Sequence, residues 1–362
     1  MARYQDGESV SGARGGGITH PLDGVPGYGE LVEVAPNVYW SRIPMPGKLD
    51  HINVWLLRDD DGVSVIDTGM YTSEAESAWT SLIGQIPGEL AIDRVLVTHM
   101  HPDHVGMAGW LVNLQPAQFW MTRMEYLTCR TLESQSLDEG VPESFTGFHR
   151  AAGWPAAAIR SYRGHYGNFG KRVYPLPRTY HRLEHGQSHI IGGHKWRVFV
   201  GSGHSPEHAC FYCKELKLLI SGDQVLPRIS SNVSVTPTEP SANPMADWLA
   251  SLRRLRAEIP NDVLVLPAHQ ECFMGLHERI DALIAEQEGS FEALRELLRR
   301  RSARVVDLFS LLFSRPIPED DPLIFSLATG EAQACLNYLW EANELTCSVD
   351  AHGVCWYRRS GI

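Results

Sequence analysis

The sequence predicts an α/β protein built from layers of sheet and helix. Apolar, β-branched segments dominate the chain after about residue 30 and then alternate with segments of helical periodicity. In addition, four strand-like segments each end in histidine or aspartate side chains. Because α/β proteins usually place their chemistry at the ends of strands, these four positions are where we look for a functional site.

The composition predicts a cytoplasmic enzyme. A chain of 362 residues with 43% apolar side chains can bury a large core in one or two domains. Its net charge of −11 argues against a general nucleic-acid surface. The chain contains no run of 18 apolar residues, and its first 20 residues lack the apolar core of a signal peptide. We expect residues 1–25 to be a flexible segment.

The seven cysteines are an odd number scattered along the chain, which indicates buried, reduced thiols and not a disulfide framework. Cys210 and Cys213 have the CxxC spacing of redox or zinc motifs. They lie within a strand-like run and no second CxxC exists, so we expect them to be packing residues.

Local patterns predict the elements of the first half. Strands are expected where β-branched residues gather, and helices where apolar residues recur at helical spacing. The expected strands are residues 38–43, 52–57, 62–67 and 92–98, and the expected helices are residues 73–86 and 105–111.

The second half predicts a helical insertion and a helical tail. Residues 120–170 have helical, aromatic-rich patterns, and strands are expected again at 189–191, 196–200 and 218–220. In the tail, helices are expected at 278–301, 305–313 and 330–345, followed by a hairpin over 347–357. We therefore expect one domain over residues 26–275 and a small C-terminal domain with a winged-helix-like outline over residues 276–362.

The densest group of polar side chains is Thr98-His99-Met100-His101-Pro102-Asp103-His104. It follows a buried strand and precedes a helix. Three imidazoles and a carboxylate within six positions are the side chains that bind divalent metals.

Three further strand ends supply the same chemistry. His204 follows residues 196–200 on a glycine-flanked turn, Asp223 follows 218–220, and His269 follows 263–267. A single histidine after a strand is more often a hydrogen-bonded loop residue. All four strand ends together predict a shared metal cavity at one edge of the sheet.

The order of these seven residues resembles the metallo-β-lactamase superfamily, whose members are hydrolases with an αββα sandwich fold. The resemblance covers about residues 30–272. It implies that His99, His101 and His204 hold one metal, that Asp103, His104 and His269 hold a second, and that Asp223 bridges both. Asp67 matches the family's strand-end aspartate, a structural residue that supports the metal loops without binding metal.

The resemblance also narrows the subfamily. Antibiotic-degrading members usually lack a bridging aspartate at the place of Asp223 and carry a secretion signal. This chain is therefore similar to the glyoxalase II, lactonase and RNA-processing branches. Its tail resembles the winged-helix-like domain of some members related to the mammalian lactamase-like endoribonuclease.

The expected cofactor is a pair of Zn²⁺ ions, and Fe or Mn would also suit the ligands. Two such metals make a bridging hydroxide available at neutral pH because they lower the pKa of bound water. Asp103 is the catalytic candidate, since its free oxygen would orient the nucleophile and pass a proton to the leaving group.

Five further residues are candidates for second-sphere or substrate contacts. Each has a plainer explanation as a surface, loop or packing residue. They are His51, His165, Tyr166, His208 and Arg228.

We expect a hydrolase of an ester, thioester or lactone, with a small acyl molecule enclosed by the insertion. One alternative, suggested only by the tail, is an RNA phosphodiesterase or endoribonuclease. It would need a positive track to the metals, and a solvated helix face explains the strong basic run of Arg299–Arg301 with Arg304. A further alternative is a mononuclear iron dioxygenase of the persulfide type. Neither nucleic acid nor a membrane is an expected partner. The tail could serve as a dimerisation module, so a homodimer is compatible with the sequence.

Overall fold

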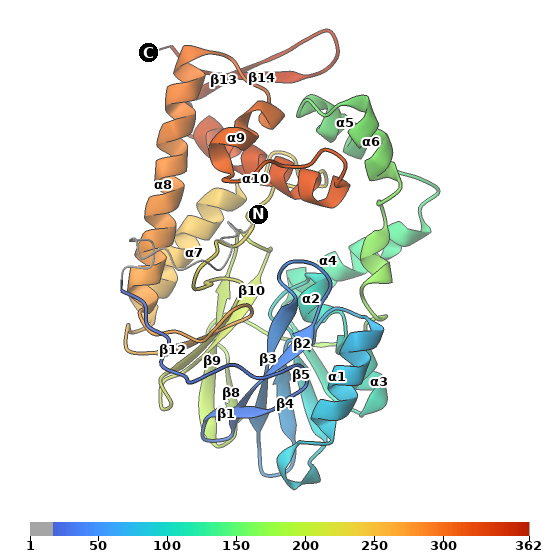
Figure 1. Cartoon of the computed structure of the whole chain (residues 1–362), viewed down its shortest axis with the longest axis vertical. Coiled ribbons are helices and arrows are strands. Elements are labelled where there is room, and N and C mark those ends of the chain that lie inside the picture. The colour runs from blue at the N-terminus through green and yellow to red at the C-terminus, as the bar shows by residue number, and fades with distance from the viewer. Residues whose placement is uncertain (1–16, 362) are drawn as a thin grey trace.

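The computed structural model describes residues 17–361, which form two β-sheets packed face to face with helices on both outer faces (Figure 1). This arrangement is the αββα sandwich that the sequence predicts. A third, two-stranded sheet lies in the C-terminal part.

The first sheet has seven strands in chain order. Strands β1 to β4 pair antiparallel, whereas β4 to β7 pair parallel. The strands are β1 (Val32–Ala35), β2 (Val38–Pro44), β3 (His51–Arg58), β4 (Val63–Ile66), β5 (Ile92–Leu96), β6 (Gln118–Met121) and β7 (His181–Arg182).

The second sheet has five strands in the order β12-β11-β10-β9-β8. All pairs are antiparallel except β11 with β12, which is parallel because α7 connects the two strands. The elements are β8 (Ser188–Ile191), β9 (His194–Gly201), β10 (His208–Cys213), β11 (Leu218–Gly222), α7 (Pro244–Glu258) and β12 (Leu264–Pro267).

Three apolar cores hold the layers together. The core between the sheets includes Trp40 and Trp55 of the first sheet and Trp196 and Phe211 of the second. The outer face of the first sheet packs on helices α1 (Ser73–Ile83), α3 (Ala108–Leu114) and α4 (Arg123–Ser134). Because β3 is buried on both faces, its sequence Ile52–Leu57 is almost continuously apolar.

The third core joins the second sheet to the C-terminal part of the chain. It contains apolar residues of α7 and of helices α8 (Leu276–Arg300), α9 (Phe309–Leu312) and α10 (Pro322–Glu341). The hairpin of β13 (Leu345–Val349) and β14 (Cys355–Arg359) closes this part. Three helices and a hairpin agree with the expected elements, and the winged-helix comparison stays a prediction.

The insertion contains α4, α5 (Glu143–Ala151) and α6 (Ala156–Arg163). Figure 1 shows α5 and α6 beside the C-terminal helices. Trp154 fixes this contact, because its indole N–H donates to Thr329 Oγ1 of α10 at 2.8 Å and its ring packs against Phe325. The insertion thus links the sandwich to the C-terminal helices.

Several expected elements differ from the structure. The helix expected at 105–111 is divided into α2 (Pro102–Val105) and α3, with Gly106 and Met107 between them. The helix expected at 330–345 begins eight residues earlier, at Pro322, where Asp321 caps the N-terminus. The first part of the expected 305–313 helix, Val305–Leu308, is a 3₁₀ turn. Helix α7 was not expected at all.

Most of the expected flexible segment, residues 1–16, lies outside the described residues. Residues 17–20 lie against the sandwich instead. Thr19 exchanges backbone hydrogen bonds with Met274, and His20 Nδ1 lies 2.9 Å from the carbonyl oxygen of Cys272.

All seven cysteines are reduced thiols, and five of them are buried, as expected. Cys210 and Cys213 both lie in β10. Within residues 17–361, the helices are all too short or too polar to cross a membrane.

Candidate metal centre

The seven predicted ligands come together at one end of the sandwich, in the loops that follow β5, β9, β11 and β12. The expectation that they share one edge of a single sheet is wrong. Strand β5 belongs to the first sheet, whereas β9, β11 and β12 belong to the second. The site therefore lies across the junction of the two sheets, because each sheet supplies a part of it.

The first group of ligand atoms belongs to three histidines. His99 Nε2 lies 2.8 Å from His101 Nδ1 and 3.1 Å from His204 Nε2, and the last two atoms are 3.0 Å apart. Nitrogen ligands of a tetrahedral zinc ion lie about 3.3 Å apart at Zn–N distances of about 2.0–2.1 Å. The three distances between the histidine nitrogens are close to this value.

The second group contains Asp103, His104 and His269. Asp103 Oδ2 lies 3.3 Å from His269 Nε2 and 3.7 Å from His104 Nε2. Both histidines are buried, and the Asp103 side chain is only partly exposed. Two imidazoles and a carboxylate are a suitable set for a borderline divalent metal.

Asp223 lies between the two groups. Its Oδ2 is 3.4 Å from His204 Nε2 and 3.5 Å from His104 Nε2, and its Oδ1 is 3.5 Å from His269 Nε2. One carboxylate thus faces a histidine of the first group and both histidines of the second.

Backbone acceptors orient two of the histidines. His204 Nδ1 lies 2.7 Å from the carbonyl oxygen of Asn232, and His269 Nδ1 lies 2.9 Å from that of His51. A carbonyl can only accept, so each Nδ1 carries the proton and each Nε2 presents a lone pair to the site. This is the arrangement in which histidines bind metals.

Asp67 and Thr98 orient the next pair. Asp67 Oδ2 accepts from His104 Nδ1 at 2.8 Å, and its Oδ1 accepts from the backbone N–H of Thr98 at 2.8 Å. The Thr98 hydroxyl donates to Asp67 and lies 3.0 Å from His99 Nδ1. Asp67 is fully buried and does not belong to either group of ligand atoms. This placement supports its predicted structural role.

The charges around the two groups differ. Burial, with the neighbouring imidazoles, lowers the pKa of His99 well below 6.5 and that of His101 to about 3. Burial also opposes protonation of His104 and His269, but the carboxylates beside them outweigh it and raise both pKa values. His99 and His101 are therefore neutral, whereas the second group is an environment that favours positive charge.

The two carboxylates respond in the opposite direction. Burial acts to raise the pKa of Asp103 and of Asp223, but the charges of His104 and His269 outweigh it and lower both. The carboxyl groups of Asp103 and Asp223 are therefore ionised, which is the form that binds a metal.

The polar atoms at the centre fit a cation. His104 Nε2 and Asp223 Oδ1 are buried and have no hydrogen-bond partner within the described chain. His99 Nε2 and His204 Nε2 face each other at 3.1 Å. Burying unpaired polar atoms costs about 1–3 kcal/mol each. Cations between these atoms would remove that cost, so the residues present fit bound metals.

Glu125 is a buried carboxylate that the sequence reasoning missed. Its Oε2 accepts from the backbone N–H of Met100 at 2.9 Å. Its Oε1 accepts from the hydroxyl of Ser205 and the backbone N–H of Glu207, both at 2.7 Å. Through Glu125, helix α4 connects the loop of His99–His104 to the loop of His204. An acidic residue on the same helix face as Tyr126 and Cys129 was the signal for this role.

Two glycines allow the ligand loops to approach their neighbours. Gly203 has φ of 104°, and a Cβ there would overlap Trp248 and the carbonyl oxygen of Pro244. Gly222 has φ of 51°, and a Cβ would lie 2.6 Å from His208 Nε2. Larger residues would displace His204 or Asp223.

Two of the five further candidates contact the ligands. His208 is fully buried, accepts from the backbone N–H of Asp223 at 3.1 Å and stacks on His99. His51 contacts the site through its backbone, since its carbonyl oxygen holds His269. Its side chain contacts Asp50.

The other three candidates have different partners. His165 Nδ1 lies 3.0 Å from the Ser161 carbonyl oxygen, and Tyr166 donates to Asp138 at 2.7 Å. Arg228 forms an exposed ion pair with Glu271 at 2.9 Å. These contacts lie outside the ligand groups, and a substrate contact for any of the three stays a prediction.

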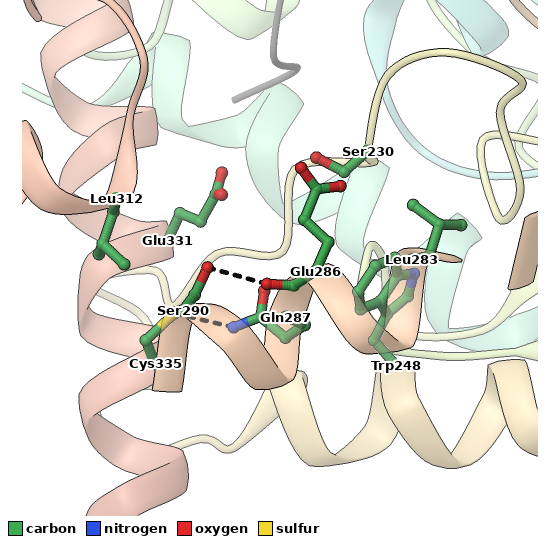
Figure 2. Close-up of a pocket in the computed structure, with 9 residues that line it drawn as sticks. All are labelled: Ser230, Trp248, Leu283, Glu286, Gln287, Ser290, Leu312, Glu331 and Cys335. Atoms are coloured by element: carbon green, nitrogen blue, oxygen red, sulfur yellow. Dashed lines mark hydrogen bonds between the residues drawn. The ribbon is translucent and has the colours of Figure 1, made fainter. Parts of the chain in front are cut away.

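A cavity lies between α7, α8 and α10 (Figure 2). Its volume, counted together with the adjoining open solvent, is about 350 Å³. Ser230 contributes to its wall and belongs to the same loop as Asn232, whose side chain donates to Glu331 of α10 at 2.8 Å. The C-terminal part thus contacts the loop that orients His204. The cavity is lined by Ser230, Trp248, Leu283, Glu286, Gln287, Ser290, Leu312, Glu331 and Cys335.

Comparison with protein families identifies the superfamily of this chain. The family model of the metallo-beta-lactamase superfamily matches residues 47–269, which include all seven predicted ligands. The chain belongs to the metallo-beta-lactamase superfamily. A second family model, the metallo-beta-lactamase-like C-terminal domain, matches residues 291–360. Within the superfamily, the chain is a metallo-hydrolase, which confirms the expected class of enzyme.

Three similar proteins illustrate the range of this superfamily. The crystal structure of a beta-lactamase domain protein from Burkholderia ambifaria is 36% identical, with a TM-score of 0.86 over 95% of this chain and 98% of that one. A probable metallo-hydrolase of Bacillus subtilis is 23% identical over 83% of this chain and 94% of its own. An atrochrysone carboxyl ACP thioesterase of Cryptosporiopsis sp. is 22% identical over 77% of this chain and 68% of its own.

Proposed function

We propose that this protein is a dinuclear metal-dependent hydrolase that cleaves an acyl thioester. The observation that carries the proposal is the position of Asp223, whose two oxygens face a histidine of the first group and both histidines of the second. His99, His101 and His204 would hold one metal, Asp103, His104 and His269 the other, and Asp223 both.

The ligand chemistry favours zinc, with iron and manganese as alternatives. Two divalent cations would lower the pKa of a water bound between them and polarise the carbonyl group of the substrate. Every other requirement falls on the chain itself, which must fix the ligands, exclude bulk water and move a proton.

We assign the proton transfer to Asp103. Its side chain is more exposed than the buried rings of His104 and His269, so it lies on the solvent side of the second group. In thioester hydrolysis, water adds to the carbonyl carbon and the carbon–sulfur bond breaks. The oxygen of the water becomes part of a carboxylate, one of its protons leaves with the thiol, and the other is released to solvent. Asp103 Oδ2 is the acceptor and donor that we propose for the proton that leaves with the thiol.

The choice of a thioester is supported by similar proteins. Two proteins named atrochrysone carboxyl ACP thioesterase match over 77% and 75% of this chain, at 22% identity each. Their names describe an acyl group held on a carrier protein by a thioester. We propose the same class of substrate here, with simple esters and lactones as the other acyl substrates.

Metal analysis and a substrate comparison test this proposal. We expect two metals per chain and hydrolysis of octanoyl thioesters, measured as released thiol, at a kcat/KM at least tenfold above that for p-nitrophenyl octanoate. Asp103→Asn should reduce kcat at least a hundredfold even at metal concentrations that fill both sites. One iron per chain with oxygen uptake would contradict the proposal. So would a dominant activity on bis-p-nitrophenyl phosphate, which would favour the phosphodiesterase alternative.

A further inference from the structure

Helix α4 has two different faces. Its inward face carries Glu125, Tyr126 and Cys129, which are buried against the sandwich. Its outward face exposes a single stripe made of Arg123, Met124, Leu127, Arg130, Thr131 and Ser134. These positions recur at helical spacing, so they form one continuous surface about 18 Å long.

The outward face contains two exposed apolar side chains that adjoin each other. Met124 is 44% exposed and Leu127 is 48% exposed. They lie three residues apart, so their side chains are neighbours on the helix. Single exposed apolar residues are common, but a pair between two arginines is typical of a surface that binds another protein.

The charge of this region differs from that of the rest of the molecule. Residues 123–178 contain eight basic and five acidic side chains, although the whole chain has a net charge of −11. Lys171, Arg172 and Arg178 are exposed, and none of them makes an ion pair within residues 17–361. The segment 168–178 lies against α4, since Tyr126 donates to the carbonyl oxygen of Pro177 at 2.9 Å.

The acidic side chains of α4 are already engaged. Glu125 is buried and accepts three hydrogen bonds from the metal loops. Glu133 pairs with Arg130 at 2.7 Å and accepts from the backbone N–H of Leu176. On the outward face of α4, the positive charge without an ion pair in residues 17–361 is therefore that of Arg123, and Lys171, Arg172 and Arg178 add exposed positive charge in the adjoining segment 168–178.

This surface adjoins the metal centre. The backbone N–H of Met124 donates to Glu207 Oε2 at 2.8 Å, and the Thr122 hydroxyl donates to the carbonyl oxygen of Glu207 at 2.8 Å. Glu207 lies three residues after the ligand His204. A partner bound on α4 would therefore sit beside the ligand loops.

We propose that the outward face of α4, with residues 171–178, binds an acidic carrier protein that delivers its acyl thioester to the metal centre. The inference rests on the proposed thioesterase function. Carrier proteins of this class are small, acidic and helical, so they complement a basic helix face with an apolar centre. A free nucleotide thioester would use the cations but not Met124 and Leu127, which is why we favour the protein.

Direct binding separates this inference from the proposed function. The full-length protein is titrated with a bacterial acyl carrier protein in its phosphopantetheine form, without an acyl group, at 20 and 300 mM salt. We expect micromolar binding at low salt that weakens at least fivefold at high salt, because exposed charges are screened. The double variant Arg123→Glu/Leu127→Asp should weaken binding at least tenfold. The control Lys195→Glu reverses an exposed charge on β9 and should have no effect.

Hydrolysis then tests whether binding serves catalysis. Octanoyl carrier protein, octanoyl coenzyme A and octanoyl N-acetylcysteamine are compared. The double variant should reduce kcat/KM for the carrier substrate at least tenfold, mainly through KM, and change the value for N-acetylcysteamine less than twofold. An equal loss for all three would overturn the docking role. Failure of the wild-type protein to bind the carrier protein would also overturn the docking role. So would a single-stranded RNA that displaces the carrier protein and binds more tightly than it does. Binding without hydrolysis of any thioester would count against the proposed function instead.

Discussion

The carboxylate of Glu125 accepts a hydrogen bond from the backbone N–H of Met100 at 2.9 Å, although the two residues belong to different elements. Met100 lies between the predicted ligands His99 and His101. The other oxygen of Glu125 accepts from Ser205 and Glu207, which follow His204 in the chain. One helix thus fixes the spacing of two ligand loops.

Glu125→Gln should weaken metal binding without removing a ligand. An amide has a single acceptor oxygen, and its NH₂ group would face the N–H donors that Glu125 now satisfies. We expect metal affinity to fall about 10- to 100-fold, as for other residues that orient ligands. The free energy of unfolding should fall by about 1–3 kcal/mol. Competition with a chromophoric chelator measures the affinity. Ser205→Ala, which removes one of the three bonds, should have a smaller effect, and exposed Glu139→Gln should have none.

Asp223→Ala tests the proposed bridging role. Removal of a carboxylate that faces both groups should lower metal content from two ions to one or fewer per chain and reduce kcat at least a hundredfold. Metal content by mass spectrometry and thiol release on the same sample give both numbers. Retention of two metals and full rate would refute the assignment. Ser231→Ala changes a neighbour whose hydroxyl donates to the Asp223 carbonyl oxygen and not to its carboxylate, and it should leave the metal content unchanged.

Metal removal should lower thermal stability. The ligands converge only in the folded chain, so metal binds the native state far better than the unfolded one. A metal concentration 100 times the Kd adds about 2.7 kcal/mol to the free energy of unfolding. Treatment with a chelator should therefore lower Tm by several degrees, and added zinc should restore it. The shift should be much smaller in His104→Ala, which lacks a ligand of the second group.

His149 makes stability depend on pH. It lies buried in α5, between the rings of Trp154 and Tyr162, and burial lowers its pKa to about 4. In the unfolded chain the pKa is about 6.5, so between these values the unfolded state binds more protons. This stability is complete above about pH 6.5 and is lost as pH falls towards 4.

The expected loss has a slope of up to about 1.4 kcal/mol per pH unit. His149→Phe should remove this component, because phenylalanine keeps the stacking on Trp154 and cannot be protonated. Urea unfolding of metal-free protein at pH 5, 6 and 7 measures the difference from wild type. His165→Phe, at an exposed position, should keep the wild-type slope. If the free energy of unfolding changed equally with pH in wild type and His149→Phe, the assignment would be contradicted.

The sequence was most informative where local chemistry was dense. The pattern of His99, His101, Asp103 and His104 predicted the metal loop, and strand-end positions predicted His204, Asp223 and His269. The structure brings all seven together. Strand predictions succeeded where burial on both faces gives continuous apolar runs, as in β3.

The predictions failed where tertiary contacts determine the burial of a residue, the start of a helix or the partner of a side chain. Glu125 resembles an ordinary acidic residue in the first turn of a helix, and only the fold shows that it is buried against two loops. The start of α10 at Pro322 depends on its cap, Asp321, in a segment without a strong apolar period. Arg228 follows a ligand loop closely, yet its partner Glu271 comes from a segment distant in sequence.

The division of the ligands between two sheets has a consequence for the chain as a polymer. A cut in the exposed residues 138–140 would leave His99, His101, Asp103 and His104 on one fragment and His204, Asp223 and His269 on the other. Neither fragment would retain a complete set of ligands. Metal would then act as a reversible crosslink, and reassembly of the two fragments would depend on the free zinc concentration.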